Sequence, residues 1–490
     1  MRFLDGPDVA LAVRDVFDDA GYTLDALTER LGPQAFNHLS SGEFAPLLRA
    51  TRGADRLDVL ARLFLIGEPV TVSAARAALA PVAVEQWAAG GLLSVRDDEI
   101  EGLVAIRPLG EPGHRLVVHD RPDRSGAVRA DHVLGISAST MALAGATIRR
   151  PIESALDLGT GCGIQGVLAA DHSRRVVATD VNPRALACAT LTMELNDLAA
   201  VTVRGGDRFD AVGGERFDLI VSNPPFVVSP SRRYVFRDSG LPLDDLSRSI
   251  VRAAPDHLEI GGYCQLLASW AHVRGEDWRA RVAGWFEGTG CDALVLEREA
   301  LDPAAHAASW LRQGGPDQWS EFDAWIDDAE AHDLEAIGFG LITMRRRQHG
   351  VPWFRAETAE QDFAMPCGDH LGALFELAAF LERHDDGSLL DVTVRAAPDV
   401  LLDEHRRASG DGWEVAARRL RQTAGLRTEG DVDPAIASFV LACDGRRPLR
   451  QVLAGVADDL DLGADELASA AVPVIRRMIE QAILLPVGGP

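Results

Sequence analysis

A glycine-rich turn between a buried strand and a helix constrains this chain more than any other feature. Residues 155–166 read ALDLGTGCGIQG, so an apolar strand runs directly into glycines and then into a helical pattern. Glycine suits such a turn because it tolerates positive φ angles and lets a ligand approach the backbone amides. Gly161, Gly163 and Gly166 fit the G-x-G-x-x-G spacing of dinucleotide-binding loops, although a tight turn without a ligand satisfies the same spacing. The segment predicts a strand–turn–helix unit of an α/β fold.

Strand and helix patterns alternate around this turn, from about residue 131 to residue 350. Helical patterns at 183–197 and 246–258 separate predicted strands. Such alternation predicts a mainly parallel sheet with helices on both faces. The polar, Trp-containing stretch 301–335 is predicted to be a helical insertion before the last strand. The predicted strands span residues 154–159, 175–181, 200–207, 217–224, 263–269, 292–298 and 338–346.

The remaining sequence predicts two small flanking domains, since 490 residues exceed one ordinary core. Residues 1–130 are expected to be mostly helical, with helices followed by a two-stranded wing whose second strand lies in 100–109. The tail repeats this order of elements, so both flanks are expected to be winged-helix-like. The predicted domains are residues 1–130, residues 131–355 with the insertion at about 301–335, and residues 380–490.

Charge and residue usage narrow the functions that this chain can have. Its 74 acidic residues against 49 basic ones give a net charge of −25, which opposes binding to long nucleic acids, although a local basic patch stays compatible. Every one of the basic residues is Arg. The absence of Lys excludes Schiff-base chemistry and a Walker-type phosphate lysine.

Cysteine spacing and hydropathy indicate the setting in which the chain works. The six cysteines are scattered without a CxxC pair or a His cluster, which argues against a structural metal site or a disulfide scaffold. We therefore expect no metal and a reducing, cytoplasmic location. No apolar run approaches the roughly 20 residues that a bilayer requires, and the N-terminus lacks the pattern of a secretory signal, so no membrane contact is expected.

Polar side chains lie at the ends of the first four predicted strands. Asp157 stands in the first strand, Asp180 lies near the end of the second, Asp207 ends the third and Asn223 lies near the end of the fourth. The motifs that hold them, DLGTGCG, ATDVNP, GGDRF and SNPPF, occur in this order. Together they resemble the class I S-adenosylmethionine-dependent methyltransferases over about residues 131–350.

This resemblance implies a Rossmann-like sheet of seven strands, the last of them antiparallel, and S-adenosyl-L-methionine as cofactor. Residues of the glycine loop would surround the methionine part of the cofactor, Asp180 would bind the ribose, and Asp207 would meet the adenine amine beside Phe209. Ser139 and Thr140 would border the methionine end or cap a helix. The cofactor-binding residues that the resemblance implies are Asp157, Gly159, Thr160, Gly161, Gly163, Asp180, Asn182, Asp207, Arg208, Phe209 and Asn223.

The fourth motif, SNPPF, carries the predicted catalytic residues Asn223, Pro224, Pro225 and Phe226. In the resembling family such a tip occurs where the methyl acceptor is a planar nitrogen, whose lone pair is delocalised and weakly nucleophilic. The Asn223 side-chain oxygen and the Pro224 carbonyl can each accept one N–H bond from that nitrogen. Phe226 offers a flat face, and the prolines stiffen the tip without adding a donor. Catalysis would then rest on positioning and electrostatics.

Two classes of acceptor are compatible with this tip. The favoured one is a protein glutamine amide (N5), in a translation factor for example, as in the release-factor methyltransferases, and Asp238 and Gly240 match positions of that group although its usual Glu-Pro element is missing. The other is an exocyclic amine of an RNA or DNA base, N6 of adenine or N2 of guanine. Two arginine groups, which are compatible with phosphate binding or with plain solvated surface, are Arg232, Arg233 and Arg237, and Arg345, Arg346 and Arg347.

Three further functions compete with these two. A small-molecule amine could replace the macromolecular acceptor. A degenerate core could make the chain a non-catalytic interaction protein, which the intact set of Asp157, Asp180, Asp207 and Asn223 opposes. A nicotinamide-dependent oxidoreductase would leave SNPPF without a role.

Overall fold

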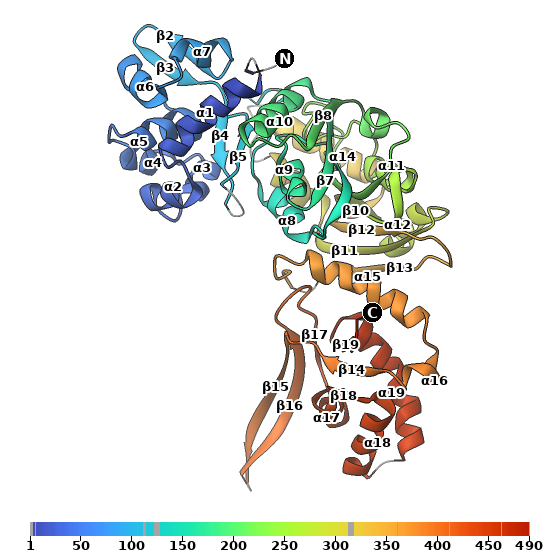
Figure 1. Cartoon of the computed structure of the whole chain (residues 1–490). Helices are drawn as coiled ribbons and strands as arrows, with labels where there is room; N and C mark the ends of the chain where they lie inside the picture. Colours follow the sequence, from blue (N-terminus) through green and yellow to red (C-terminus); the bar gives the residue numbers. More distant parts are fainter. Residues whose placement is uncertain are drawn as a thin grey trace. The chain divides into compact units, whose positions relative to one another are not determined.

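The computed structural model describes residues 3–4, 6–110, 114–121, 128–311, 318–359, 361–410, 412–461 and 463–489 (Figure 1). The chain divides into two compact units. One consists of residues 1–143 and 150–358, and the other of residues 144–149 and 359–490. Because the first unit holds both the N-terminal helices and the large sheet, the predicted boundaries at residues 130, 355 and 380 stay predictions.

A mixed sheet of eight described strands forms the centre of the first unit, in the order β13-β11-β12-β10-β9-β6-β7-β8. The strands β8, β7, β6, β9 and β10 run parallel to their neighbours, and β12 is antiparallel to both β10 and β11. The predicted reversal of the seventh strand is therefore confirmed. The strands are β6 (Ile152–Leu158), β7 (Ser173–Asp180), β8 (Val201–Gly205), β9 (Phe217–Ser222), β10 (Leu258–Val273), β11 (Cys291–Leu301), β12 (Leu334–Arg346) and β13 (Phe354–Thr358).

The edge strand β13 was not expected, so the prediction of seven strands was one strand too low. Its sequence, FRAET, is short and only partly buried, and it lacks the run of branched apolar residues that marks a central strand. It pairs in parallel with β11 from Ala293↔Phe354 to Glu297↔Thr358. The register of a neighbouring strand, rather than its own hydrophobic pattern, makes this segment extended.

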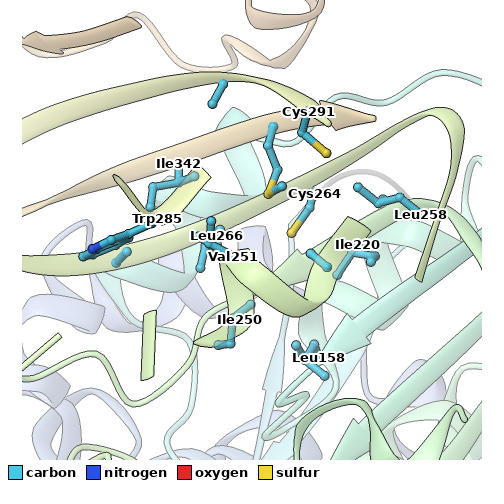
Figure 2. Close-up of a cluster of buried hydrophobic side chains, with 14 of the residues drawn as sticks. Leu158, Ile220, Ile250, Val251, Leu258, Cys264, Leu266, Trp285, Cys291 and Ile342 are labelled. Carbon is cyan, nitrogen blue, oxygen red and sulfur yellow. The ribbon is translucent and has the colours of Figure 1, made fainter. Parts of the chain in front are cut away.

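Helices cover the sheet and close its core. They are α8 (Ala138–Ala146), α9 (Ile164–Ala170), α10 (Pro183–Leu195), α11 (Asp245–Ala253), α12 (Trp278–Phe286), α13 (Pro303–Leu311) and α14 (Gln318–Ala331), with 3₁₀ turns at Arg208–Ala211 and Ala254–His257. Figure 2 shows Ile250 and Val251 of α11 and Trp285 of α12 packed toward Ile220 of β9 and Leu266 of β10. This burial holds β9 and β10 in place, and the loop that follows β9 carries the SNPPF tip.

The N-terminal part of the first unit is mostly helical, as expected. A three-stranded sheet of order β1-β3-β2 follows its first helices, and the order of elements is the one expected for a winged helix, an assignment that stays a prediction. The elements are α1 (Pro7–Asp19), α2 (Leu24–Leu31), α3 (Ala35–Ser41), α4 (Phe44–Ala50), α5 (Arg56–Ala61), a π-helical turn (Arg62–Ile66), β1 (Val70–Thr71), α6 (Val72–Leu79), α7 (Val84–Ala89), β2 (Leu93–Arg96), β3 (Glu99–Gly102), β4 (Ala105–Pro108) and β5 (Leu116–His119).

The predicted wing strand at 100–109 was wrong in its second half. Only β3 pairs with β2, whereas β4 forms a separate hairpin with β5. That hairpin packs on α10, where the Val118 amide donates to Thr192 Oγ1 at 3.0 Å and the Leu116 amide donates to Asn196 Oδ1 at 2.9 Å. These long-range contacts, which the local pattern does not reveal, join the N-terminal part to the large sheet.

The second unit combines helices, a small sheet of order β18-β14-β19 and a long hairpin. The helix–strand–helix–helix–strand order of α17 to β19 repeats the predicted pattern, but the middle strand β14 comes from earlier in the chain, and the winged-helix assignment again stays a prediction. The elements are α15 (Gly368–Glu382), α16 (Asp386–Leu389), β14 (Thr393–Ala396), β15 (Val400–Ser409), β16 (Gly412–Gln422), β17 (Glu429–Asp431), α17 (Pro434–Ala442), β18 (Asp444–Pro448), α18 (Leu449–Leu460), α19 (Ala464–Glu480) and β19 (Leu484–Pro486).

Two structural surveys cover the described residues. No described helix combines the length and apolarity needed to cross a bilayer. Among these residues, no three His, Cys, Asp or Glu side chains gather in a way that could hold a metal ion. All six cysteines are free thiols and all are buried.

Candidate active site

A cavity of about 390 Å³ opens at the carboxyl ends of β6, β7, β8 and β9. Ligands of open α/β sheets bind at this edge, where loops from several strands converge. The cavity gathers twelve of the predicted cofactor-binding and catalytic residues. They are Asp157, Gly159, Thr160, Gly161, Asp180, Asn182, Asp207, Arg208, Asn223, Pro224, Pro225 and Phe226.

The glycine loop is held in shape by the end of the neighbouring strand β7. The amides of Gly159 and Thr160 donate to the Thr179 carbonyl at 2.9 and 2.8 Å, and the Gly161 amide donates to Asp180 Oδ2 at 2.9 Å. Gly159 and Gly161 have φ angles of 74° and 56°, and a Cβ at either position would meet no atom within 4 Å. These two glycines therefore leave open space for a ligand beside the backbone.

Two predicted cofactor residues lie outside this cavity. A Cβ on Gly163 would come within 2.8 Å of Met193 Cε, so this glycine permits close packing of α9 on α10. The Phe209 ring stacks on His257 with 4.5 Å between centroids and is part of the hydrophobic core. Both residues pack behind the edge of the sheet. The spacing of the motif does not distinguish such packing residues from residues that contact a ligand.

Asp157 is buried beneath the loop. Its Oδ2 accepts hydrogen bonds from Thr160 Oγ1 at 2.5 Å and from the Gly166 amide at 2.8 Å. Burial raises the pKa of this carboxyl to about 7, although both hydrogen bonds oppose the rise. The residue both organises the turn and contributes a titratable group to the cavity.

Asp180 and Asn182 end β7 and begin α10. Asp180 Oδ1 accepts from the Asn182 amide at 2.8 Å, and burial raises the pKa of Asp180. Asn182 caps α10, since its Oδ1 accepts from the Arg184 amide at 2.9 Å and Pro183 occupies the first helical turn. Its Nδ2 donates to the Asp131 carbonyl at 2.9 Å, so Asn182 ties the helix to the segment 131–137 that lines the cavity.

A buried ion pair that sequence reasoning missed anchors the same segment. Asp120 follows β5 and pairs with Arg184 of α10, whose Nε lies 2.7 Å from Asp120 Oδ1. Asp120 Oδ2 also accepts from the Val133 amide at 2.9 Å. Burial opposes ionisation of Asp120, but hydrogen bonds from Arg184 and Val133 lower its pKa overall. Pairing across 64 residues leaves no local pattern by which to find it.

At the adenine end predicted for the cavity, Asp207 lies largely exposed, and its Oδ2 is 3.1 Å from Arg208 Nη2. At the opposite end, Ser137 caps the start of α8, because the Thr140 amide donates to its Oγ at 3.2 Å. Ser139 and Thr140 line the cavity. The helix cap is therefore Ser137 and not Ser139 or Thr140, the two residues for which the sequence suggested a capping role.

The SNPPF tip places one unsatisfied acceptor at this cavity. Asn223 Oδ1 is buried and has no hydrogen-bond partner among the described residues. A buried polar atom without a partner costs about 1–3 kcal/mol, so its retention calls for an explanation by function or by a bound group. Ser222 Oγ donates to the Leu158 carbonyl at 2.8 Å and fixes the end of β9 beside the glycine loop.

The arginines that follow the tip differ in their surroundings. Arg232 and Arg233 are exposed, but Arg237 is buried and its Nε donates to Asp238 Oδ1 at 2.7 Å. Asp238 Oδ2 also accepts from the amides of Arg233 and Tyr234 at 2.9 and 3.0 Å. Arg237 and Asp238 thus organise the loop after the tip. Of this first arginine group, only Arg232 and Arg233 are exposed in the way that phosphate binding would require.

The second arginine group also has a structural role. Arg345 and Arg347 lie 3.1 and 2.8 Å from the carboxylate oxygens of the buried Asp292, and Arg346 Nη1 donates to the Leu258 carbonyl at 2.6 Å. Two guanidinium groups share one carboxylate, so the triplet keeps a net positive charge, but each of its three side chains is held within the sheet. The structure therefore favours the reading of this triplet as part of the sheet.

Comparison with known proteins identifies the family. The Methyltransferase small domain model matches residues 137–274. The release factor glutamine methyltransferase of Geobacter sulfurreducens is 32% identical over 212 residues, which are 40% of this chain and 72% of that relative. The chain belongs to the class I S-adenosylmethionine-dependent methyltransferases.

Other relatives of this methyltransferase are named for different acceptors. The ribosomal protein uL3 glutamine methyltransferase of Bradyrhizobium diazoefficiens is 37% identical over 134 residues, 24% of this chain and 42% of that one. The ribosomal RNA small subunit methyltransferase C of Alcanivorax borkumensis is 32% identical over 114 residues, 23% of this chain and 31% of that one. The methyltransferase thus spans less than half the length of these two relatives.

The flanking parts and the solved structures add no assignment of function. Residues 19–103 and 372–486 match two domains of unknown function (DUF7059 and DUF7782). A putative methyltransferase from Bacillus halodurans is 16% identical, with a TM-score of 0.30, over 43% of this chain and all of that one. A putative methyltransferase from Streptococcus mutans, solved in complex with SAH, is 14% identical, with a TM-score of 0.25, over 43% of this chain and 99% of that one.

Proposed function

We propose that this methyltransferase transfers the methyl group of S-adenosylmethionine to the side-chain amide nitrogen of a protein glutamine. The observation that carries the proposal is Asn223 Oδ1, a buried acceptor without a partner at the edge of the cavity. An amide NH₂ can satisfy this oxygen with one N–H and the Pro224 carbonyl with the other. Relatives named as glutamine methyltransferases support the amide over other planar nitrogens.

The residues of the cavity fit the proposed cofactor. When bound, S-adenosylmethionine would supply an electrophilic methyl group on a sulfonium. The open space beside Gly159 and Gly161 suits the methionine part, Asp180 can accept hydrogen bonds from ribose hydroxyls, and Asp207 from the adenine amine. Asn223 and Pro224 hold the acceptor nitrogen in line, which is a positioning role that requires no strong base.

A base amine is the second candidate, supported by relatives named as ribosomal RNA methyltransferases. The two are separated by incubating the full chain with cofactor labelled in the methyl group and an extract of cells lacking this protein. We expect label in macromolecules that protease destroys and nuclease spares. Label that survives protease and disappears with nuclease would contradict the glutamine proposal.

The raised pKa of Asp157 predicts how cofactor affinity depends on pH. With a pKa near 7, Asp157 is protonated in acid and loses its attraction to the ammonium group of the methionine part. The Kd of S-adenosylhomocysteine should therefore rise as pH falls below about 7, by up to tenfold per pH unit from this group alone. Calorimetry between pH 5.5 and 8.5 would measure it.

The matched control for this pH dependence is Asp157→Asn, which keeps an oxygen for the Thr160 and Gly166 hydrogen bonds. Because burial also raises the pKa of Asp180, the Kd of S-adenosylhomocysteine will still depend on pH in that variant. The slope of log Kd against pH should nevertheless be smaller than in the natural chain by about one below pH 7. Equal slopes would show that Asp157 is not the titrating group.

A further inference from the structure

A second cavity, of about 440 Å³, adjoins the cofactor cavity on the far side of the SNPPF tip. Phe226 and Trp310 line both cavities, so the tip stands at the boundary between them. The second cavity is further lined by Phe339 of β12 and by residues of the helical insertion α13 and α14. Asn223 and Pro224 line the first cavity and are joined to the second through Phe226 of the same tip.

The helical insertion packs on the SNPPF tip as well as on the sheet. Val227, Ala307, Leu311 and Trp325 form a small buried cluster, against which Phe226 and Trp310 pack. His306 Nε2 lies 3.0 Å from the Val228 carbonyl and fixes α13 to the residues that follow the tip. The insertion and the tip therefore form one structural element.

The cavity offers flat apolar faces. The Phe226 ring lies 4.8 Å from the Phe339 ring and 6.4 Å from the Trp310 ring, measured between centroids. Aromatic rings arranged in this way accept a planar group by stacking or edge contact. Such a group would be oriented before its nitrogen reached the tip.

The charged residues that line the cavity disfavour a phosphate. Glu299 and Glu321 contribute carboxylates, and the one buried guanidinium of this lining, Arg237, is bound by Asp238 and lies 3.8 Å from Glu321 Oε1. The remaining cation, Arg233, is exposed and lies over the Tyr234 ring, with its Cζ 5.0 Å from the centroid. A nucleotide would bring a phosphate close to two carboxylates, whereas a peptide amide brings no charge.

We propose that this second cavity is the acceptor site, that it takes an uncharged side-chain amide on a peptide rather than a nucleotide, and that Trp310 of α13 is its specificity-determining residue. The proposal rests on the proposed function and names the element that selects its substrate. The amide lies against the faces of Phe226 and Trp310 with its nitrogen at Asn223. The insertion, which packs on the tip, then serves recognition of the acceptor.

Binding to the full chain saturated with S-adenosylhomocysteine tests this assignment, with N-acetylglutamine N-methylamide and adenosine monophosphate as probes and saturation-transfer NMR as readout. We expect the amide to bind the natural chain more tightly than the nucleotide does. Trp310→Leu, which keeps apolar volume but removes the flat face, should raise the Kd of the amide at least tenfold, and Trp310→Phe should raise it less than threefold.

The matched control is Trp319→Ala in α14. Trp319 is 83% exposed and lines neither cavity, so this variant should leave the Kd of the amide unchanged. Because Trp310 also lines the cofactor cavity, a cooperative unfolding transition like that of the natural chain, rather than S-adenosylhomocysteine affinity, reports correct folding of each variant. Tighter binding of the nucleotide, failure of the amide to bind, or equal Kd values in Trp310→Leu and the natural chain would each overturn the assignment. The proposed function fails separately, if Asn223→Ala methylates the cell extract as the natural chain does.

Discussion

Replacing Asn223 by Ala should lower methyl transfer by about 10²- to 10³-fold, the usual cost of removing one preorganised polar group from an active site. Asn223 Oδ1 is buried without a partner, so its desolvation is already complete before the acceptor arrives. An oxygen in this state gains more from a substrate N–H than a solvated one does. The loss should appear in turnover, measured with labelled cofactor and cell extract.

The controls for Asn223 separate chemistry from binding. The affinity for S-adenosylhomocysteine should stay within about threefold in Asn223→Ala, because Asp157, Asp180 and the glycine loop are untouched. Asn223→Asp keeps an acceptor oxygen at the same place and should recover part of the turnover. A loss of cofactor affinity as large as the loss of turnover would assign Asn223 to the cofactor instead.

The sheet and the cofactor edge were predictable because their signals are local. Buried strands followed by Asp180, Asp207 and Asn223 place three polar groups at one sheet edge once the strands are parallel. The reversed strand β12 followed from the family resemblance and is confirmed by its pairing with β10 and β11. The first of these inferences needs only the order of segments along the chain, whereas the reversal came from the resemblance.

The differences from expectation share another cause, which is contact between segments distant in the sequence, and cofactor contact by Gly163 and Phe209 stays a prediction. Gly163 and Phe209 have the right residue types for the motif, but their neighbours Met193 and His257 come from other elements. Arg237 looked like a free cation because its neutralisation depends on how the loop closes around Asp238. Strand β13 and the hairpin of β4 with β5 likewise depend on partners rather than on their own pattern.

Composition predicted the helices of the insertion but not which of their residues contact the tip. The Trp-containing, acidic stretch at 301–335 was predicted to be helical, and α13 and α14 confirm this. That Trp310 contacts the SNPPF tip while Trp319 is exposed could not be read from the sequence, because both lie in similar surroundings along the chain. Only the packing of α13 on Val227 and Val228 distinguishes them.

Replacing Asp120 by Ala should have the largest effect on stability, lowering the free energy of unfolding by about 3 kcal/mol or more. The change leaves the Arg184 guanidinium buried without its partner and frees the Val133 amide. The segment that contains Val133 lines the cofactor cavity, so we also expect weaker binding of S-adenosylhomocysteine. Chemical denaturation and calorimetry on the full chain would measure the two effects.

The double variant Asp120→Ala, Arg184→Ala separates the effect of the ion pair on stability from the effect of the segment around Val133 on cofactor binding. Removing both charges eliminates the unpaired guanidinium, so the double variant should be more stable than the sum of the single losses predicts. Cofactor affinity should not recover, because the Val133 amide still lacks its acceptor. Glu85→Ala, which breaks the exposed pair with Arg76, is the control and should cost less than about 1 kcal/mol. If Asp120→Ala cost no more than this control, the N-terminal part would not hold the cofactor segment through Asp120.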